Sequence, residues 1–252
     1  MPETPPVPIL RPAGRDAKIP PLRLTRALVD RLPARVDEEG PVMGDPVPDS
    51  YYTEMTATLL AEADPGGLWV FASGSLIWNP RMPVIERRHA LVHGWHRSFC
   101  LGPSRRNRGS PSRPGRMMSM DRGGSCHGIV QRMTPCNEAA DLEALLRLEP
   151  PCPPVWVRGK TPSGVVRAIA FTAHPSYWGY SPECGIDELA DILASSVGTR
   201  GTMAEYLLNT CEHLAEAGIH DRHLWRLQAM VAERLERLPE HAVQEAADAG
   251  RP

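Results

Sequence analysis

The chain has 252 residues, of which 42% are hydrophobic and 23% charged, and its formal net charge is −2 at pH 7. This allows a sizeable core in one large or two small domains, and provides no field that attracts nucleic acid or membranes. No apolar run reaches the length of a membrane span. The six cysteines are scattered without a C-x-x-C pair, and residues 1–14 lack a signal-peptide core, so we expect a cytoplasmic protein.

The first part of the chain leads up to one strongly apolar segment. Residues 1–22 are polar and rich in proline, which predicts poor order. Helices are expected over 24–32 and 51–62, and the apolar run Leu68–Ala72 predicts a strand buried on both faces. The expected organisation is a partly disordered extension over 1–50, a folded domain over 51–239 and a frayed tail over 240–252.

Strand patterns and one long loop occupy the middle of the chain. Ala90–Leu101 alternates and predicts a strand, whereas 102–116 holds five Arg, three Gly and three Pro and predicts a loop. Two hairpins are expected, from strands 116–120 and 126–133 and from strands 155–158 and 165–172, with a helix over 137–148 between them.

The last third of the chain has helical periodicity. A helix is expected over 187–197, and Thr202 with Glu205 forms a capping box that opens a second helix. Asp221 is the expected cap of a third. Strands first and helices last, without βαβ alternation, indicate an α+β fold.

A loop of small residues follows the buried strand. Ser73, Gly74 and Ser75 let the backbone turn sharply, so that the N–H groups around Gly74–Leu76 would lie at a fixed place. Such groups can hold a carboxylate or an oxyanion. An ordinary turn is the alternative that the spacing leaves open.

Glu149 is the candidate general base. It stands where a predicted helix ends, and the negative helix terminus together with Leu146 and Leu148 would raise its pKa. A raised pKa suits a base that works near neutral pH. The residues alone also allow a surface glutamate, and Glu143 is the second choice for the base.

Two further groups of residues have both a functional and an ordinary interpretation. His93 and His96 lie on the strand predicted over 90–101, and His89 directly precedes it. On a strand His96 points opposite to His93, so no metal site is expected. The five loop arginines (105, 106, 108, 113 and 116) could bind RNA or simply be solvated. No aromatic residue is interleaved and the chain is not basic, so no nucleic-acid partner is expected.

Several of these motifs together resemble the ChaC-type γ-glutamylcyclotransferases. Ser73 stands where that family usually has Tyr, and Leu148 precedes Glu149 where the family usually has Arg. The motifs that carry the resemblance are Gly74-Ser75-Leu76, Trp78-Asn79-Pro80, the strand Gly94–Cys100, Arg108-Gly109, Pro114-Gly115-Arg116, and Tyr206 followed by Gly218-Ile219-His220-Asp221.

The resemblance implies a small mixed β-barrel flanked by helices and an enzyme, a lyase. It would release 5-oxoproline from a γ-glutamyl substrate, above all glutathione, with Cys-Gly as the other product. Glu149 would be catalytic, with no cofactor, no metal and an oligomeric state left open. The implied substrate-binding residues are Ser73, Gly74, Ser75, Leu76, Arg108, Gly115, Arg116 and Tyr206. The alternatives are a cyclotransferase for other γ-glutamyl amines and a non-catalytic regulatory binding protein.

Overall fold

The computed structural model describes residues 7–10, 19–41 and 47–238. Its contacts divide the chain into two compact units. The barrel unit holds Asp45–Arg97 and Ser119–Tyr177 with the first strand, and the helical unit holds Lys18–Gly44, Ser98–Met118 and the chain from Trp178 onward. The expectations for the tail 240–252 and for most of 1–22 concern residues outside the described part.

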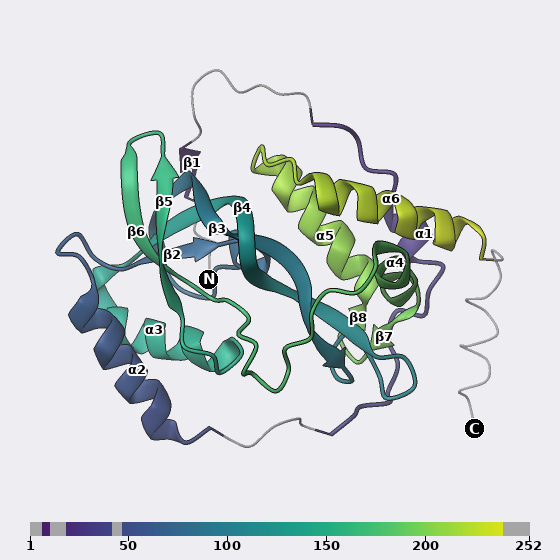
Figure 1. Ribbon diagram of the computed structural model, residues 1–252, viewed down its shortest axis with the longest axis horizontal. Helices are drawn as coiled ribbons and strands as arrows, with labels where there is room; N and C mark the ends of the chain where they lie inside the picture. Colours follow the sequence, from purple (N-terminus) through teal and green to yellow (C-terminus); the bar gives the residue numbers. More distant parts are fainter. Residues whose placement is uncertain (1–6, 11–18, 42–46, 239–252) are drawn as a thin grey trace, which may run out of the picture. The chain divides into compact units, whose positions relative to one another are not determined.

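Five strands close the barrel. A sixth strand, β1 (Ile9–Leu10), pairs with β3 alone. The barrel strands are β2 (Trp69–Ala72), β3 (Val84–Ser104), β4 (Gly115–Met133), β5 (Val155–Thr161) and β6 (Gly164–Ala170) (Figure 1). They bond in the order β3, β4, β2, β6, β5, and a further pairing of β5 with β3 completes the ring. Because β2 is antiparallel to β4 but parallel to β6, the barrel is mixed, as expected.

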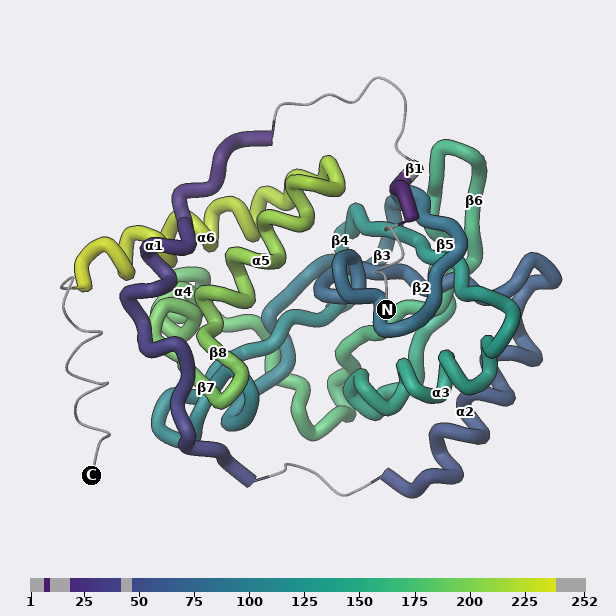
Figure 2. Tube along the Cα trace, turned by 180° about the vertical axis from the view of Figure 1, so that it is seen from behind, coloured from purple at the N-terminus to yellow at the C-terminus, as the bar shows by residue number. Residues whose placement is uncertain are grey.

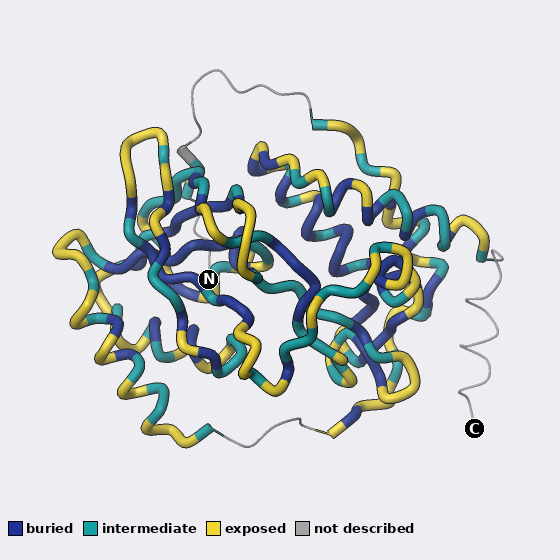
Figure 3. Tube along the Cα trace, in the orientation of Figure 1, coloured by how far each residue is buried: buried dark blue, intermediate teal, exposed yellow. Residues whose placement is uncertain are grey.

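β2 is the buried strand that its sequence predicts. All four of its residues are buried (Figure 3). Trp69 and Phe71 belong to the hydrophobic cluster that includes Val130 and Ala168 from the two neighbouring strands. Successive side chains of a strand alternate between its faces, so these two residues share the face that packs into this core.

The glycines at 123 and 124 lie within a strand, so the expected hairpin over 116–133 is wrong. Both have positive φ angles, 105° and 64°, yet β4 continues through them from Gly115 to Met133. Glycine tolerates such angles without ending the pairing. β3 is the partner there, and the guanidinium carbon of Arg122 lies 4.9 Å from the ring centre of Trp95.

Two helices of the barrel unit lie side by side, α2 (Asp49–Glu62) and α3 (Glu138–Leu148) (Figure 1). Both were expected from the sequence. Arg147 joins them, with nitrogens 2.6 Å from a carboxylate oxygen of Asp49 and 2.8 Å from one of Glu143. α3 ends at Leu148, so Glu149 is the first residue to leave the helix, with extended backbone angles.

Three long helices form most of the helical unit, and both predicted caps are confirmed. Thr202 Oγ1 accepts a hydrogen bond from Glu205 N at 2.9 Å, and Asp221 Oδ1 accepts from Leu224 N at 3.2 Å. The elements are α1 (Arg26–Val29), α4 (Ile186–Ser195), β7 (Val197–Gly198), β8 (Gly201–Thr202), α5 (Met203–Glu216) and α6 (Arg222–Glu236). Across the described residues, no helix is both long and apolar enough to span a bilayer.

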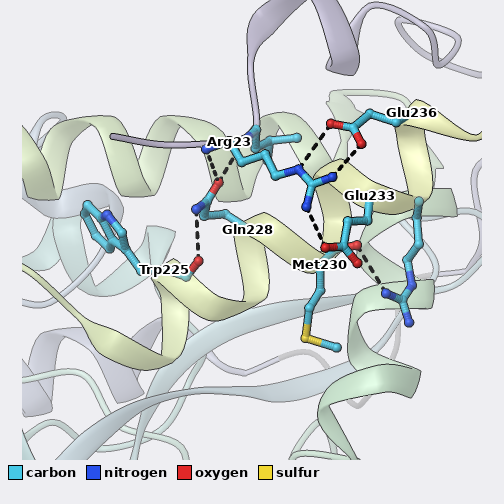
Figure 4. A network of polar contacts seen from close by, with 8 residues as sticks. Arg23, Trp225, Gln228, Met230, Glu233 and Glu236 are labelled. Atoms are coloured by element: carbon cyan, nitrogen blue, oxygen red, sulfur yellow. Dashed lines mark hydrogen bonds and ion pairs between the residues drawn. The ribbon is translucent and has the colours of Figure 1, made fainter. Parts of the chain in front are cut away.

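Residues 19–41, which we call the strap, lie along the helical unit (Figure 2). The backbone N–H groups of Arg23 and Leu24 donate to the side-chain oxygen of Gln228 at 2.9 and 2.8 Å (Figure 4). Gln228 is buried, and Trp225 donates its ring N–H to the carbonyl of Pro20 at 2.8 Å. The strap is therefore fastened to α6 through buried polar contacts.

We predict that Gln228→Ala lowers the free energy of unfolding by about 1–3 kcal/mol, because two strap N–H groups lose their acceptor. Urea denaturation measures this change. Arg23→Ala is the matched control, since its ion pairs with Glu233 and Glu236 are exposed and screened by solvent. Arg23→Ala should lower the free energy of unfolding less than Gln228→Ala does. A larger loss in Arg23→Ala would contradict this account of the strap.

Candidate active site

A tight turn follows β2, and its carbonyl groups are bonded to the protein. We call Ser73–Leu76 the cradle turn. It leads into a single turn of 3₁₀ helix, η1 (Ser75–Ile77). The carbonyl of Gly74 accepts from Ile77 N at 2.8 Å, and the carbonyl of Ser75 accepts from Asn79 N at 2.8 Å. The turn thus satisfies two carbonyls with its own backbone.

Side chains from β3 and β4 hold the two remaining carbonyls. Arg97 Nε donates to the carbonyl of Ser73 at 2.5 Å, and Gln131 Nε2 donates to the carbonyl of Leu76 at 3.0 Å. Both side chains belong to buried residues, 5% and 0% exposed. The conformation of the turn is therefore fixed by the neighbouring strands as well as by its small residues.

Three N–H groups of the cradle turn are left without a protein acceptor. Those of Gly74, Ser75 and Leu76 bond to none of the described residues. In a planar trans peptide the C=O and the following N–H point in opposite directions. Because the carbonyls of residues 73–75 point to protein donors, these N–H groups point the other way. Backbone N–H groups can bind a carboxylate or a developing oxyanion.

Glu149 has the electrostatics of a general base. Burial raises the pKa of Glu149 from 4.5 to about 7, and the positive charge of Arg81 opposes this only in part. Leu146 is buried, but Leu148 is 61% exposed and contributes little to the burial that the sequence led us to expect from it. Desolvation of the charged carboxylate is thus the main cause of the raised pKa.

Arg81 connects Glu149 with the cradle turn. Its φ angle is 58°, in the left-handed region that few non-glycine residues adopt. With the Asn79 amide oxygen turned toward it, that oxygen accepts from Arg81 Nε at 3.0 Å and Nη2 at 3.1 Å. Asn79 is also bonded to the carbonyl of Ser75. Arg81 therefore bonds to a residue that follows the turn and also acts electrostatically on Glu149, and both belong to the barrel unit.

The other predicted binding residues belong to the helical unit, where Arg108, Gly115 and Tyr206 lie close together. Arg108 Nη1 is 2.7 Å from a carboxylate oxygen of Glu205, and its guanidinium carbon lies 5.7 Å from the ring centre of Tyr206. A Cβ added to Gly115 would be 3.1 Å from the carbonyl oxygen of Arg108, so a side chain is poorly tolerated there.

Arg116 is likewise bonded to protein groups of the helical unit. It donates to the carbonyl of Pro182 at 2.8 Å and to Ser181 Oγ at 3.0 Å. Both arginines implied by the resemblance, Arg108 and Arg116, thus stabilise their own unit. Their contact with substrate stays a prediction.

The sequence alone missed several residues that support the site. Gln131 and Arg81 belong to no motif that was singled out. Arg97 was quoted only as part of a strand motif, and Asn79 only as part of Trp78-Asn79-Pro80. Within the described part of the chain, no three His, Cys, Asp or Glu side chains gather in a way that could hold a metal ion.

The fold is that of the γ-glutamylcyclotransferases. A crystal structure from yeast, described as a γ-glutamyl cyclotransferase specific to glutathione, matches with a TM-score of 0.59 at 22% sequence identity. The match covers 67% of this chain and 99% of the yeast chain. The small barrel flanked by helices that the resemblance implied is thereby confirmed.

The chain belongs to the ChaC-like protein family, whose sequence model matches residues 68–234. The glutathione-specific γ-glutamylcyclotransferase of Escherichia coli (strain K12) is 32% identical over 171 residues, covering 66% of this chain and 74% of that protein. Glutathione-specific γ-glutamylcyclotransferase 1 of Mus musculus is 30% identical over 173 residues, covering 65% and 77%. The region matched by the family model contains every predicted site residue and leaves the strap outside.

We predict that Glu149→Gln stabilises the protein at high pH. The pKa of Glu149 is about 7 in the folded protein instead of the ordinary 4.5, so folding is disfavoured once the carboxyl group is charged. The free energy of unfolding therefore falls as the pH rises from 4.5 to about 7. Above pH 7 the substitution should add on the order of 3 kcal/mol to the free energy of unfolding, and at pH 4 almost nothing. Urea denaturation at both pH values tests this, and equal effects at both would contradict the burial of the carboxyl group.

Proposed function

We propose that this protein is a γ-glutamylcyclotransferase that converts glutathione into 5-oxoproline and Cys-Gly. The observation that supports it best is the buried carboxyl group of Glu149, with a pKa near 7. The turn after β2 adds three N–H groups that bond to none of the described residues. The names of its relatives in Escherichia coli and mouse support glutathione as the substrate. We expect the protein to act in the cytoplasm, where glutathione is kept reduced.

The reaction is an intramolecular acyl transfer. The α-ammonium group of the γ-glutamyl residue cannot attack until Glu149 removes a proton from it. The free amine then forms a bond to the γ-carbonyl carbon and closes a five-membered ring. The bond from that carbon to the Cys-Gly nitrogen breaks, and Glu149 returns the proton to this leaving amine. The ring nitrogen loses its second proton to solvent and ends as the single N–H of 5-oxoproline. One carboxyl group can serve as base and then as acid, because its pKa lies near the working pH.

The cradle turn supplies the complementary positive potential. Its N–H groups would hold the substrate's α-carboxylate or the oxygen that becomes negative when the amine attacks. Holding both reacting groups of one molecule in place provides a large part of the acceleration in ring closure. Arg108, Gly115, Arg116 and Tyr206 remain proposed contacts for the rest of the substrate.

We predict that Glu149→Gln lowers kcat for 5-oxoproline release by about two to four orders of magnitude, since it removes the base. In the unmodified enzyme kcat/KM should rise with pH through about 7, as the carboxyl group ionises. Glu143→Gln is the matched control, because Glu143 is paired with Arg147 at 2.8 Å. Normal turnover by Glu149→Gln would disprove the assignment.

Position 73 offers a test of substrate preference. The family usually has Tyr where this chain has Ser73. If the site is built for glutathione in the same way, we predict that Ser73→Tyr lowers KM or raises kcat, because the added ring restricts the bound γ-glutamyl group. If the site has instead been rebuilt around Ser73, the ring will overpack it and lower stability by about 1–3 kcal/mol. Kinetics and a melting curve separate the two cases. Reduced activity with reduced melting temperature would favour another γ-glutamyl amine as the substrate.

A further inference from the structure

Arg97 bonds to two segments at once, the residue after β2 and the interior of β4. From β3, its Nε donates to the carbonyl of Ser73 at 2.5 Å, and its Nη2 donates to the carbonyl of His127 on β4. The residue is 5% exposed, so these bonds form away from solvent. Two acceptors on different segments require the planar fork of a guanidinium group, which the single ammonium of lysine does not reproduce.

The first N–H of the cradle turn depends on this contact. The carbonyl of Ser73 and the N–H of Gly74 belong to one planar peptide unit and point in opposite directions. The next two carbonyls, of Gly74 and Ser75, accept from N–H groups of the turn itself. The carbonyl of Ser73 instead accepts from a side chain on another strand, so Arg97 decides where the Gly74 N–H points.

The strands around this peptide leave it little freedom. A Cβ added to Gly128 on β4 would lie 2.5 Å from the carbonyl oxygen of Ala72, the last residue of β2. β2 and β4 therefore approach as closely as glycine allows immediately before the turn. In addition, a charged donor on a carbonyl polarises the peptide and strengthens its N–H as a hydrogen-bond donor.

We propose that Arg97 is a positioning residue that aims and polarises the Gly74 N–H toward the anionic group of the bound γ-glutamyl substrate. This rests on the proposed function, since the substrate is the one named there. Arg97 itself does not touch the substrate and acts through the Ser73–Gly74 peptide.

Arg97→Lys is the main test, because it keeps the positive charge but loses the fork. A donor displaced by about 1 Å can lower the rate by about 100-fold, so we expect kcat/KM for glutathione to fall by about 10- to 100-fold. The kcat/KM of Arg97→Gln, which also removes the charge, should fall further. Arg122→Lys makes the same change at an exposed position of β4 and should keep normal kinetics. A higher KM would mean that the turn binds the substrate carboxylate, and a lower kcat would mean that it binds the oxyanion. Either result supports the proposal.

A measurement without substrate separates this proposal from the proposed function. In Arg97→Lys, ¹⁵N relaxation should show order parameters for Gly74–Leu76 that fall from about 0.85 toward 0.6, while those of β2 are unchanged. If the unmodified protein turns over no γ-glutamyl compound, the proposed function fails, but these order parameters still decide whether Arg97 fixes the turn. Unchanged kinetics and order parameters in both Arg97→Lys and Arg97→Gln would overturn the proposal. So would unfolding of both variants, since Arg97 would then be needed for the fold as a whole.

Discussion

Removal of water from one carboxyl group is the constraint on which this site depends. A glutamate at the end of an exposed helix would be ionised far below neutral pH and would be a weak base. Here burial raises the pKa of Glu149 to about 7. The folded protein thus keeps a group that is destabilised in its charged form, and the barrel core must offset that cost. Such a local loss of stability is common where a residue has to accept and release protons.

The cradle turn is the electrostatic counterpart of this carboxyl group. Its carbonyls accept from Arg97, Gln131 and the backbone just after the turn, and its N–H groups at 74–76 find no acceptor among the residues that the structure describes. Fixed dipoles need no reorganisation when charge develops on a substrate, and this is why rigid backbone donors are effective. Arg81 bonds to Asn79 just after the turn, and its charge opposes the rise in the pKa of Glu149. The balance of burial and this one charge therefore sets the pKa of Glu149.

Local sequence was enough to predict most of the elements. The apolar run before Ser73, the caps Thr202 and Asp221 and the end of the helix before Glu149 are short-range signals, and each lies where it was expected. The supporting contacts could not be predicted because they join distant residues. Arg97 is 24 positions from Ser73, and Gln131 is 55 positions from Leu76. The hairpin expected in β4 failed for the same reason, since pairing with β3 decides how its glycines are used.

The central claim is that the Glu149 carboxyl group titrates near neutral pH because it is buried. The most direct test is a ¹³C NMR titration of the Glu149 side-chain carboxyl in the intact protein without substrate, assigned by comparison with Glu149→Gln. The account predicts a midpoint near pH 7, to be moved further upward by Arg81→Gln, which removes the opposing charge. A midpoint near 4.5, the usual value, would contradict it.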